Sequence, residues 1–389
     1  MKTGKQTRKR VLVVFGTRPE AIKMAPVVME LRKYPGEIQT TVCVTAQHRE
    51  MVDQVMRLFD IRPDYDLDIM REDQSLAHVT ANVLTGVEKV IEKEKPDWIL
   101  LQGDTTTVMA AALVAFYHRV KVGHVEAGLR TWNKFHPFPE EINRVIADRV
   151  CDLHFAPTES ARENLLREGV DEAGIHVTGN TVIDALRWVV TRPLTADVHA
   201  MFRKIGLKDH GGSSRILLVT AHRRENFGEP LRNICLALKD IVARHPDVKI
   251  VYPVHMNPNV RRVAHEILGG VPEITLLDPL DYLPMVQLIN GSFLVLTDSG
   301  GLQEEAPGLG KPVLVLRDVT ERPEAVEAGT ARVVGTGRER IVAEASMLLL
   351  DSGEYGKMAR AVNPYGDGKA AERIVSILMA DQKITPIPA

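Results

Sequence analysis

The amino-acid sequence predicts an α/β protein with two Rossmann-like domains and a central cleft. Short, β-branched apolar runs alternate with amphipathic stretches from one end of the chain to the other, which is typical of parallel sheets with crossover helices. At 389 residues, the chain is also longer than a single hydrophobic core usually supports. A polar, glycine-rich segment at residues 207–214 interrupts the alternation, and we interpret it as a linker or domain boundary.

The first half of the chain carries six strand-like runs, which are almost continuously apolar. Such runs are expected where helices cover both faces of a parallel sheet. Helical patterns lie between them, at Ile22–Tyr34, Ala77–Lys93 and Glu140–Arg149 among others. The predicted strands are Val11–Phe15, Thr41–Thr45, Trp98–Gln102, Lys121–Val125, Leu153–Ala156 and Ile175–Thr178.

The same alternation restarts after the polar segment and predicts a second sheet. In open parallel sheets, ligands bind beyond the carboxyl ends of the strands, so the residues directly after each strand are the candidates for a binding site. The predicted strands of this half are Arg215–Thr220, Lys249–Pro253, Ile274–Leu277, Phe293–Thr297, Val313–Leu316 and Ala331–Val334.

The composition argues against several classes of function. A net charge of −2 provides no overall positive field for nucleic acid or an anionic membrane. No run approaches the roughly 18 apolar residues of a membrane span. The three cysteines, Cys43, Cys151 and Cys235, are far apart and odd in number, which is typical of reduced thiols. We therefore expect a cytoplasmic protein whose partners include neither nucleic acid nor membrane.

The turn after the first predicted strand carries two candidate anion ligands. Gly16 and Pro19 favour a tight turn into a helix whose N-terminal N–H groups face a ligand. Arg18 and Lys23 lie at the start of that helix, where cations oppose the helix dipole. They could belong to a solvated surface, but this local conflict favours a binding role. The chain contains no P-loop and no G-x-G-x-x-G motif, so we expect no NAD site.

Three carboxylates follow strands or begin a helix in the first half. Asp104 and Glu126 come shortly after the strands that end at Gln102 and Val125. Asp104 could cap the next helix, although the three threonines behind it could do so instead. Glu140 follows two prolines that place it in a first helical turn, where a helix-start role is expected for a single residue. Three such groups bordering one cleft favour a catalytic role.

A metal site is the alternative for the same region. His124 lies two residues before Glu126, and His136 lies four residues before Glu140. Neither spacing matches an H-E-x-x-H helix or a cluster of thiolates. We therefore expect no metal.

The first strand of the second half is followed by His222 and Arg223. A histidine and arginines at a strand end could contact a phosphate, or they could form part of a surface charge cluster. Further along the chain, after a later strand, Arg317 and Arg322 are additional phosphate candidates or surface residues.

The sharpest pattern is the turn Ser299-Gly300-Gly301 between an apolar strand and a predicted helix. Its glycines let the backbone approach a ligand, and its N–H groups and helix dipole suit a diphosphate. Glu304 or Glu305, one turn further on, could accept hydrogen bonds from ribose hydroxyls. The spacing therefore predicts a nucleoside diphosphate site.

Seven motifs together resemble one enzyme family. They are GTRPEAIK (16–23), GDTTT (103–107), GHVEAGLRT (123–131), PFPEEINR (137–144), AHRREN (221–226), DSGGLQEEAP (298–307) and TERPEA (320–325). In this order they resemble the non-hydrolysing UDP-N-acetylglucosamine 2-epimerases, over nearly the whole chain. The resemblance implies a glycosyltransferase-B-type fold, a homodimer, and neither metal nor NAD as cofactor.

The resemblance also implies domain limits and roles for individual residues. It implies a first domain at residues 1–185, a UDP-binding domain at 206–366, and a closing helix within 367–389 that packs back on the first domain. The implied catalytic carboxylates are Asp104, Glu126 and Glu140, and we group His222 with them. The other implied contacts of the UDP-sugar are Arg18, Lys23, Ser299, Gly300, Gly301, Glu305 and Arg322.

Members of this family are often activated by a second molecule of UDP-N-acetylglucosamine. The substrate is therefore also a candidate activator of this protein. Glu50 and Asp73 stand where the family commonly has Gln and Arg, and two acidic groups facing a diphosphate would weaken such a site. The implied positions are Gln47, Glu50, Asp73, Glu140, Arg223 and His255.

The expected reaction interconverts UDP-N-acetylglucosamine and UDP-N-acetylmannosamine. The C2 proton is not next to a carbonyl, so enolisation cannot remove it, and the missing dinucleotide motif disfavours oxidation by NAD. Expelling UDP to leave a 2-acetamidoglucal, and then adding it back, needs cations at the diphosphate and more than one carboxylate for the proton. Glu126 and Asp104 are the leading pair and Glu140 the third; which one removes the proton stays open.

Three other functions fit parts of the same pattern. A UDP-sugar-dependent glycosyltransferase of the same fold would share the nucleotide site. A regulator that binds a nucleotide sugar without turnover would have no use for the three carboxylates. A hydrolysing epimerase would release free N-acetylmannosamine.

Overall fold

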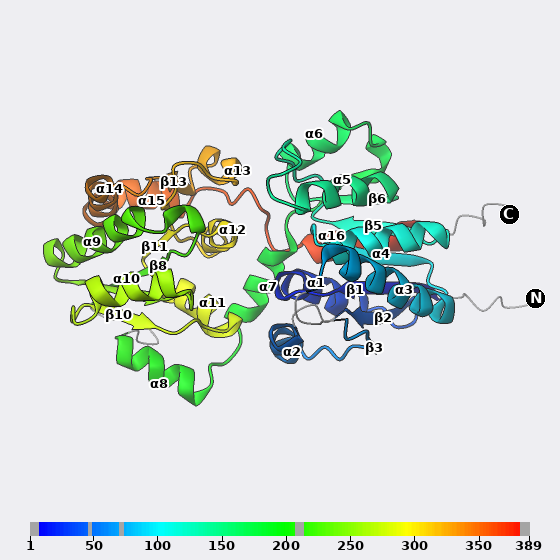
Figure 1. The fold of residues 1–389 in the computed structure, drawn as a ribbon, viewed down its shortest axis with the longest axis horizontal. Helices are drawn as coiled ribbons and strands as arrows, with labels where there is room; N and C mark the ends of the chain where they lie inside the picture. The colour runs from blue at the N-terminus through cyan, green and yellow to red at the C-terminus, as the bar shows by residue number, and fades with distance from the viewer. Residues whose placement is uncertain (1–7, 46–48, 70–73, 207–213, 382–389) are drawn as a thin grey trace, which may run out of the picture. The chain divides into compact units, whose positions relative to one another are not determined.

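The computed structural model describes residues 8–45, 49–69, 74–206 and 214–381, which form two compact units (Figure 1). The first unit contains the described residues up to Ala185 and those from Tyr365 onward. The second unit runs from Leu186 to Pro364. Of the polar segment predicted to be a linker, residues 207–213 lie outside the described residues.

A seven-stranded parallel sheet forms the centre of the first unit, in the order β3-β2-β1-β4-β5-β6-β7. Six of its strands were predicted from apolar runs. β3 was missed because two residues are too short to form a pattern. The strands are β1 (Lys9–Phe15), β2 (Ile38–Val44), β3 (Tyr65–Asp66), β4 (Trp98–Gln102), β5 (Lys121–Val125), β6 (Leu153–Ala156) and β7 (Ile175–Val177).

Helices cover this sheet and explain its apolar strands, since every residue of β4 is buried. Helix α3 packs against α4, and α4 packs against α5. The helices are α1 (Arg18–Leu31), α2 (Arg49–Leu58), α3 (Leu76–Glu94), α4 (Thr106–Tyr117), α5 (Glu140–Val150), α6 (Glu159–Arg167), α7 (Thr181–Val190), α16 (Ala370–Ala380) and the 3₁₀ turn Glu172–Gly174.

The end of the described chain returns to the first unit, where α16 packs against α1. Asp184 in α7 accepts hydrogen bonds from the N–H groups of Ala370 and Ala371, at 3.2 and 2.9 Å, and so caps the start of α16. The N–H of Asn180 donates to the carbonyl of Tyr365 at 2.7 Å. The contact between Asp184 and Ala370 joins residues that are 186 positions apart in the sequence.

The second unit is built on a six-stranded parallel sheet in the order β10-β9-β8-β11-β12-β13. All six strands were predicted. They are β8 (Arg215–Thr220), β9 (Val248–Pro253), β10 (Ile274–Leu277), β11 (Leu294–Thr297), β12 (Val313–Val315) and β13 (Ala331–Val333). The helices are α8 (Ala196–Ile205), α9 (Glu229–Arg244), α10 (Pro258–Leu268), α11 (Tyr282–Gly291), α12 (Gly300–Gly308), α13 (Pro323–Glu327), α14 (Arg338–Leu350), α15 (Ser352–Ala359) and the 3₁₀ turn Arg224–Asn226.

The predicted class, α/β with two Rossmann-like domains, is confirmed by these two parallel sheets and their alternating helices. Within the part of the chain that the structure describes, no helix combines the length and apolar character that crossing a membrane requires.

Candidate active site

Asp104 and Glu126 come shortly after two neighbouring central strands of the first sheet, at the carboxyl ends of these strands. They follow β4 and β5, which are neighbouring parallel strands with Gln102 opposite Val125. The N–H of Gly103 donates to the Val125 carbonyl at 3.1 Å, so the pairing continues past the end of β4. Because parallel strands share one carboxyl edge, two carboxylates from distant motifs meet there.

Glu126 is buried and surrounded by polar groups that hold its carboxylate in place. Lys23 Nζ lies 2.5 Å from Glu126 Oε1, and Asn180 Nδ2 donates to the same oxygen at 2.9 Å. Gln102 Nε2 donates to Oε2. Lys23, predicted to contact a ligand, is therefore the ion-pair partner of a predicted catalytic residue.

Asp104 is not the cap of the next helix, because the hydroxyl of Thr105 accepts the N–H of Val108 at 3.4 Å and caps α4. This leaves the Asp104 carboxylate to bind Arg144, whose Nε and Nη2 donate to Oδ2 at 3.0 and 2.7 Å. The side chain of Asp104 is 30% exposed, so a ligand can still reach it. The alternative role of Asp104 as a helix cap is thus excluded.

Glu140 is the first residue of α5, as the two prolines predicted. One turn further along this helix, Asn143 Nδ2 donates to the Asp104 carbonyl at 2.9 Å, and Arg144 binds the Asp104 carboxylate. Residues three and four apart share a helix face, so Glu140 faces the same side as these two contacts. The helix therefore brings the third carboxylate toward Asp104.

The first turn of α1 is held by Glu20, a buried residue that the sequence analysis did not single out. Its Oε2 accepts the N–H groups of Gly16 and Thr17 at 2.6 and 2.8 Å, and Thr105 donates its hydroxyl to Oε1. Burial raises the pKa of Glu20, although the hydrogen bonds oppose this. Glu20 thus fixes the turn at whose end Arg18 begins α1.

A buried network lies beneath the segment that follows Glu126, and sequence reasoning missed it. Asp148 Oδ1 is 2.5 Å from His124 Nδ1, while its Oδ2 accepts from Arg130 Nη2 at 2.7 Å and from the Gly128 N–H at 3.3 Å. Burial alone would raise the pKa of Asp148, but His124 and Arg130 hold it well below its usual range. Asp148 and Arg130 lie 18 residues apart in the sequence, so no local pattern revealed the pair.

In the second unit, Asp298 is the buried carboxylate that accepts several hydrogen bonds. It follows β11 directly and is fully buried. Its Oδ2 accepts the N–H groups of His222 and Arg223 at 2.7 and 2.8 Å and the Nδ2 of Asn226 at 2.9 Å. One carboxylate therefore shapes the whole turn after β8, although it lies 76 residues from His222 in the sequence.

His222 itself faces a second histidine. Its ring stacks on His255, with centroids 5.3 Å apart and planes inclined by 12°. Burial lowers the pKa of His222, and His255 and Arg223 lower it further against the opposing charge of Asp298. His222 is therefore held mainly as the neutral imidazole near neutral pH.

The turn Ser299-Gly300-Gly301 begins α12, as predicted. A Cβ added at Gly300 would lie 3.8 Å from Arg223 Nη2 and 3.9 Å from Arg322 Nη2. Two guanidinium groups thus converge on the positive end of one helix. Such an arrangement of like charges suits an anion, and Arg forms bidentate bonds with phosphate.

Of the two candidate ribose ligands, Glu304 is already engaged. It is buried, and its carboxylate accepts from Arg322 Nε. Glu305 is less buried, and its Oε1 would lie 3.8 Å from a Cβ added at Gly301, which places its carboxylate beside the glycine turn. The greater exposure of Glu305 therefore favours it as the candidate for the ribose.

Arg317 and the positions predicted for a second nucleotide site remain to be placed. Arg317 forms ion pairs with Glu225 and Glu321, at 2.6 and 3.3 Å. Gln47 and Asp73, predicted for the second nucleotide site, lie outside the described residues, as does the side chain of Glu50. The activator site therefore stays a prediction.

The alternative of a metal site rested on His124, Glu126, His136 and Glu140. Among residues 8–45, 49–69, 74–206 and 214–381, no group of three or more His, Cys, Asp or Glu side chains could hold a metal ion. Both ring nitrogens of His124 are occupied, since Nδ1 faces Asp148 and Nε2 lies 2.7 Å from the Gly103 carbonyl oxygen.

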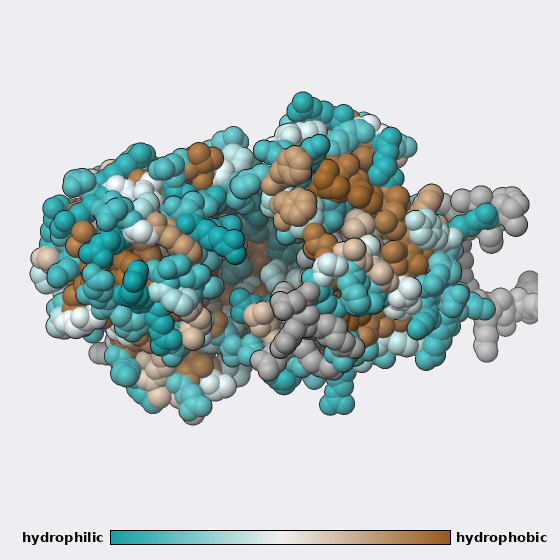
Figure 2. All heavy atoms as spheres, viewed as in Figure 1, coloured by the Kyte–Doolittle hydropathy of each residue, from teal (hydrophilic) through white to brown (hydrophobic). Residues whose placement is uncertain are grey.

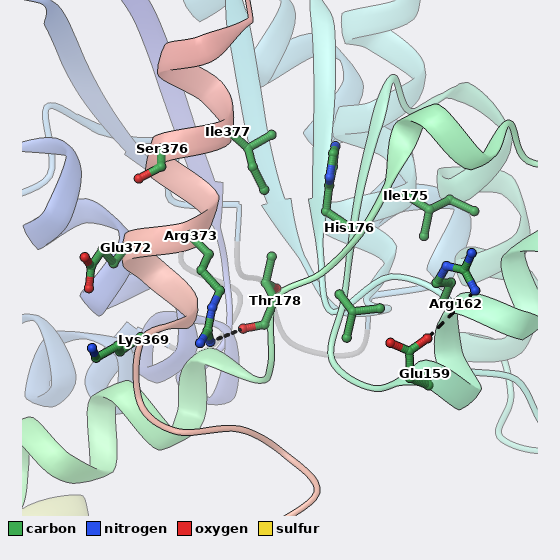
Figure 3. A pocket seen from close by; sticks show the side chains of 11 residues that line it. Glu159, Arg162, Ile175, His176, Thr178, Lys369, Glu372, Arg373, Ser376 and Ile377 are labelled. Carbon is green, nitrogen blue, oxygen red and sulfur yellow. Dashed lines mark hydrogen bonds and ion pairs between the residues drawn. The ribbon is translucent and has the colours of Figure 1, made fainter.

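A pocket of about 730 Å³ lies elsewhere in the first unit, between the edge strand β7 and α16 (Figure 3). In it, Arg373 Nη1 donates to the Thr178 carbonyl at 3.0 Å, and Arg162 pairs with Glu159. Its lining includes none of the predicted site residues and mixes both signs of charge, so it shows no preference for a diphosphate.

Chemically, the two units offer different groups. The first unit offers carboxylates in an ordered polar setting, as proton transfer requires. The second unit offers arginines, a neutral histidine and helix N–H groups, and these groups together suit a diphosphate.

Known proteins are similar to this chain over nearly its whole length. The family model described as UDP-N-acetylglucosamine 2-epimerase matches residues 29–379. The UDP-N-acetylglucosamine 2-epimerase of Yersinia pestis is 55% identical over 375 residues, which cover 96% of this chain and 99% of that protein. The enzyme of the same name from Escherichia coli K12 is 54% identical over 369 residues, which cover 95% of this chain and 98% of that protein. The crystal structure of the UDP-GlcNAc 2-epimerase from Neisseria meningitidis bound to UDP-GlcNAc is 48% identical, with a TM-score of 0.84 over 96% of this chain and 100% of that one. The structural likeness confirms the glycosyltransferase-B-type fold.

Proposed function

Because this chain belongs to the UDP-N-acetylglucosamine 2-epimerase family and is an isomerase, we propose that it interconverts UDP-N-acetylglucosamine and UDP-N-acetylmannosamine. The observation that carries this proposal is the placement of Asp104 and Glu126 after two register-paired strands. The Neisseria meningitidis relative was solved bound to UDP-GlcNAc, which supports the same substrate here.

In the proposed reaction, a carboxylate removes the C2 proton while the C1–O bond to UDP breaks, which leaves a 2-acetamidoglucal. The diphosphate oxygen then adds back to C1, and a proton is delivered to the opposite face of C2. Two proton transfers on opposite faces need two positioned groups, for which Asp104 and Glu126 are the leading pair and Glu140 the third. Which of them removes the proton is left to experiment.

The second unit has the complementary role of holding UDP as it leaves. Arg223 and Arg322 lie beside Gly300 at the N-terminus of α12, where a developing negative charge is stabilised without rearrangement. The neutral His222 can donate a hydrogen bond to the same diphosphate. Glu305 would accept hydrogen bonds from the ribose.

The test is incubation with UDP-N-acetylglucosamine in deuterated water, with no acceptor present. An epimerase incorporates deuterium at C2 and forms UDP-N-acetylmannosamine, which NMR detects. A glycosyltransferase would leave C2 unlabelled, and a hydrolysing epimerase would release the free sugar. A protein that binds UDP without any of these products would be a regulator, and the proposal would be wrong.

Asp104→Asn and Glu126→Gln test the catalytic assignment. Each removes the ability to accept a proton while keeping size and polarity, so we expect deuterium exchange to fall at least about 10²-fold. UDP affinity, measured by calorimetry, should change little, because the proposed diphosphate contacts lie on the second unit. Undiminished exchange in both variants would contradict the assignment.

The chain is also proposed to form a homodimer through the first unit. Figure 2 shows apolar surface over the region of α4 and α5, and larger patches of this kind mark protein contacts. Light scattering should then give twice the chain mass of 43.2 kDa, and a monomer at micromolar concentration would disprove it. Exposed large apolar side chains on α4, on α5 and in the segment between β5 and α5 are Phe116, Tyr117, Trp132, Phe135, Phe138, Ile142 and Val145.

A further inference from the structure

His124 is a buried histidine at the end of β5 whose two ring nitrogens both face hydrogen-bond acceptors. Nδ1 lies 2.5 Å from Asp148 Oδ1, and Nε2 lies 2.7 Å from the carbonyl oxygen of Gly103. A carbonyl oxygen can only accept, so Nε2 must carry a hydrogen. A neutral imidazole has only one N–H, so the second bond also requires a proton, on either His124 or Asp148.

The surroundings place that proton on His124. The other oxygen of Asp148 accepts from Arg130 Nη2 and from the Gly128 N–H, which favours the ionised carboxylate. His154 is a further polar neighbour, with its Nε2 2.8 Å from the Asp148 carbonyl. Burial by itself would lower the pKa of His124, as does Arg130, but Asp148 and the Gly103 carbonyl raise it overall.

This ion pair holds both segments that carry the leading carboxylates. Through Nε2, the ring of His124 fixes the carbonyl of Gly103, the residue directly before Asp104. Through Nδ1, the ring binds Asp148, which in turn accepts the N–H of Gly128, two residues after Glu126. His124 is itself only two residues before Glu126, and so it lies at the point where the two segments meet.

We propose that His124 is a positioning residue that acts as an imidazolium and holds Asp104 and Glu126 at the separation that proton transfer on both faces of the sugar requires. The proposal rests on the proposed function in so far as these two carboxylates perform the chemistry. His124 has no contact with substrate to make, because both of its nitrogens are occupied. Its effect is therefore on turnover and not on binding.

Two substitutions of His124 distinguish the contribution of its hydrogen bond to Gly103 from that of its bond to Asp148. The amide nitrogen of Gln can occupy the place of Nε2, and that of Asn the place of Nδ1. His124→Gln should keep the bond to the Gly103 carbonyl, whereas His124→Asn should keep only the bond to Asp148. We expect kcat to fall about 10²-fold in His124→Asn and clearly less in His124→Gln, because misplacing a reacting group by about 1 Å costs a factor of this size. KM should stay within about threefold in both, as in the control His118→Gln at a surface ion pair with Glu88.

The charge of His124 is measured independently of activity, in the unaltered protein labelled with ¹⁵N-histidine. Both ring nitrogens should show the chemical shifts of protonated nitrogen at pH 7. The signals of His124 are those that disappear from the spectrum of His124→Gln. An unprotonated nitrogen among these signals would overturn the proposal, as would equal kcat in the two variants and the wild type, or a larger loss in His124→Gln. If the wild type incorporated no deuterium while both nitrogens were protonated, the proposed function would fail instead.

Discussion

Asp298 and Asp148 show how single buried carboxylates organise this protein at the scale of the residue. Each accepts several hydrogen bonds from a segment that carries predicted site residues, Asp298 from the turn after β8 and Asp148 from the segment after β5. A buried charge is tolerated only where other groups compensate it. Asp148 is compensated by its ion pair with Arg130, and Asp298 by three hydrogen bonds to one of its oxygens. The predicted site residues are thus held in place by buried neighbours that were not themselves predicted to contact a ligand.

Gly128 is needed for steric reasons at this scale. Its φ is +86°, and a Cβ there would lie 2.2 Å from the carbonyl oxygen of Ala161. Gly128→Ala should therefore lower the free energy of unfolding by at least about 2 kcal/mol, measured by urea denaturation. In the control Gly36→Ala, the new Cβ would have no neighbour within 4 Å, so we expect almost no change. Equal stability of the two variants would show that the segment after Glu126 can move freely.

At the scale of the element, α1 begins with a capping box that does more than start a helix. Glu20 and Thr17 form this box: the carboxylate of Glu20 accepts the N–H groups of Gly16 and Thr17, just before α1, and it also reaches Thr105 at the start of α4. One side chain therefore fixes the starts of two helices that border the carboxyl edge of the first sheet.

Replacing Glu20 tests this connection. Glu20→Ala leaves two buried N–H groups without acceptors and should lower the free energy of unfolding by about 2 kcal/mol. Glu20→Gln should cost much less, because its amide oxygen can accept from Gly16 and Thr17 while its NH₂ group faces the Thr105 hydroxyl. Equal losses in the two variants, measured by urea denaturation, would show that the negative charge matters more than the hydrogen bonds.

At the scale of the whole molecule, stability should depend on pH through the buried pair of His124 and Asp148. The pKa of His124 is raised in the folded protein, so its contribution is fully present below the unfolded value of about 6.5 and is lost as the pH rises through the folded value. The pKa of Asp148 is lowered, so its contribution is present above about 4 and is lost as the pH falls further.

The Tm difference between wild type and His124→Gln should therefore be largest between about pH 4 and 6.5 and should narrow on either side of that window. Calorimetry from about pH 3 to 9 measures it. His118→Gln, whose ion pair with Glu88 is partly exposed, should show a small difference throughout. A constant difference for His124→Gln across the range would mean that the pair does not titrate as described.

The sequence by itself determined the α/β class, twelve of the thirteen strands and the start of α5 at Glu140, because apolar runs, prolines and helix starts are local patterns. Tertiary structure alone decided which polar groups meet. Asp104, which the sequence left as either a helix cap or a catalytic group, binds Arg144, 40 residues away. Glu304, one of two candidate ribose ligands, binds Arg322. Such pairs depend on how strands are ordered in a sheet, and that order follows from the packing of the whole unit, which no short stretch of sequence contains.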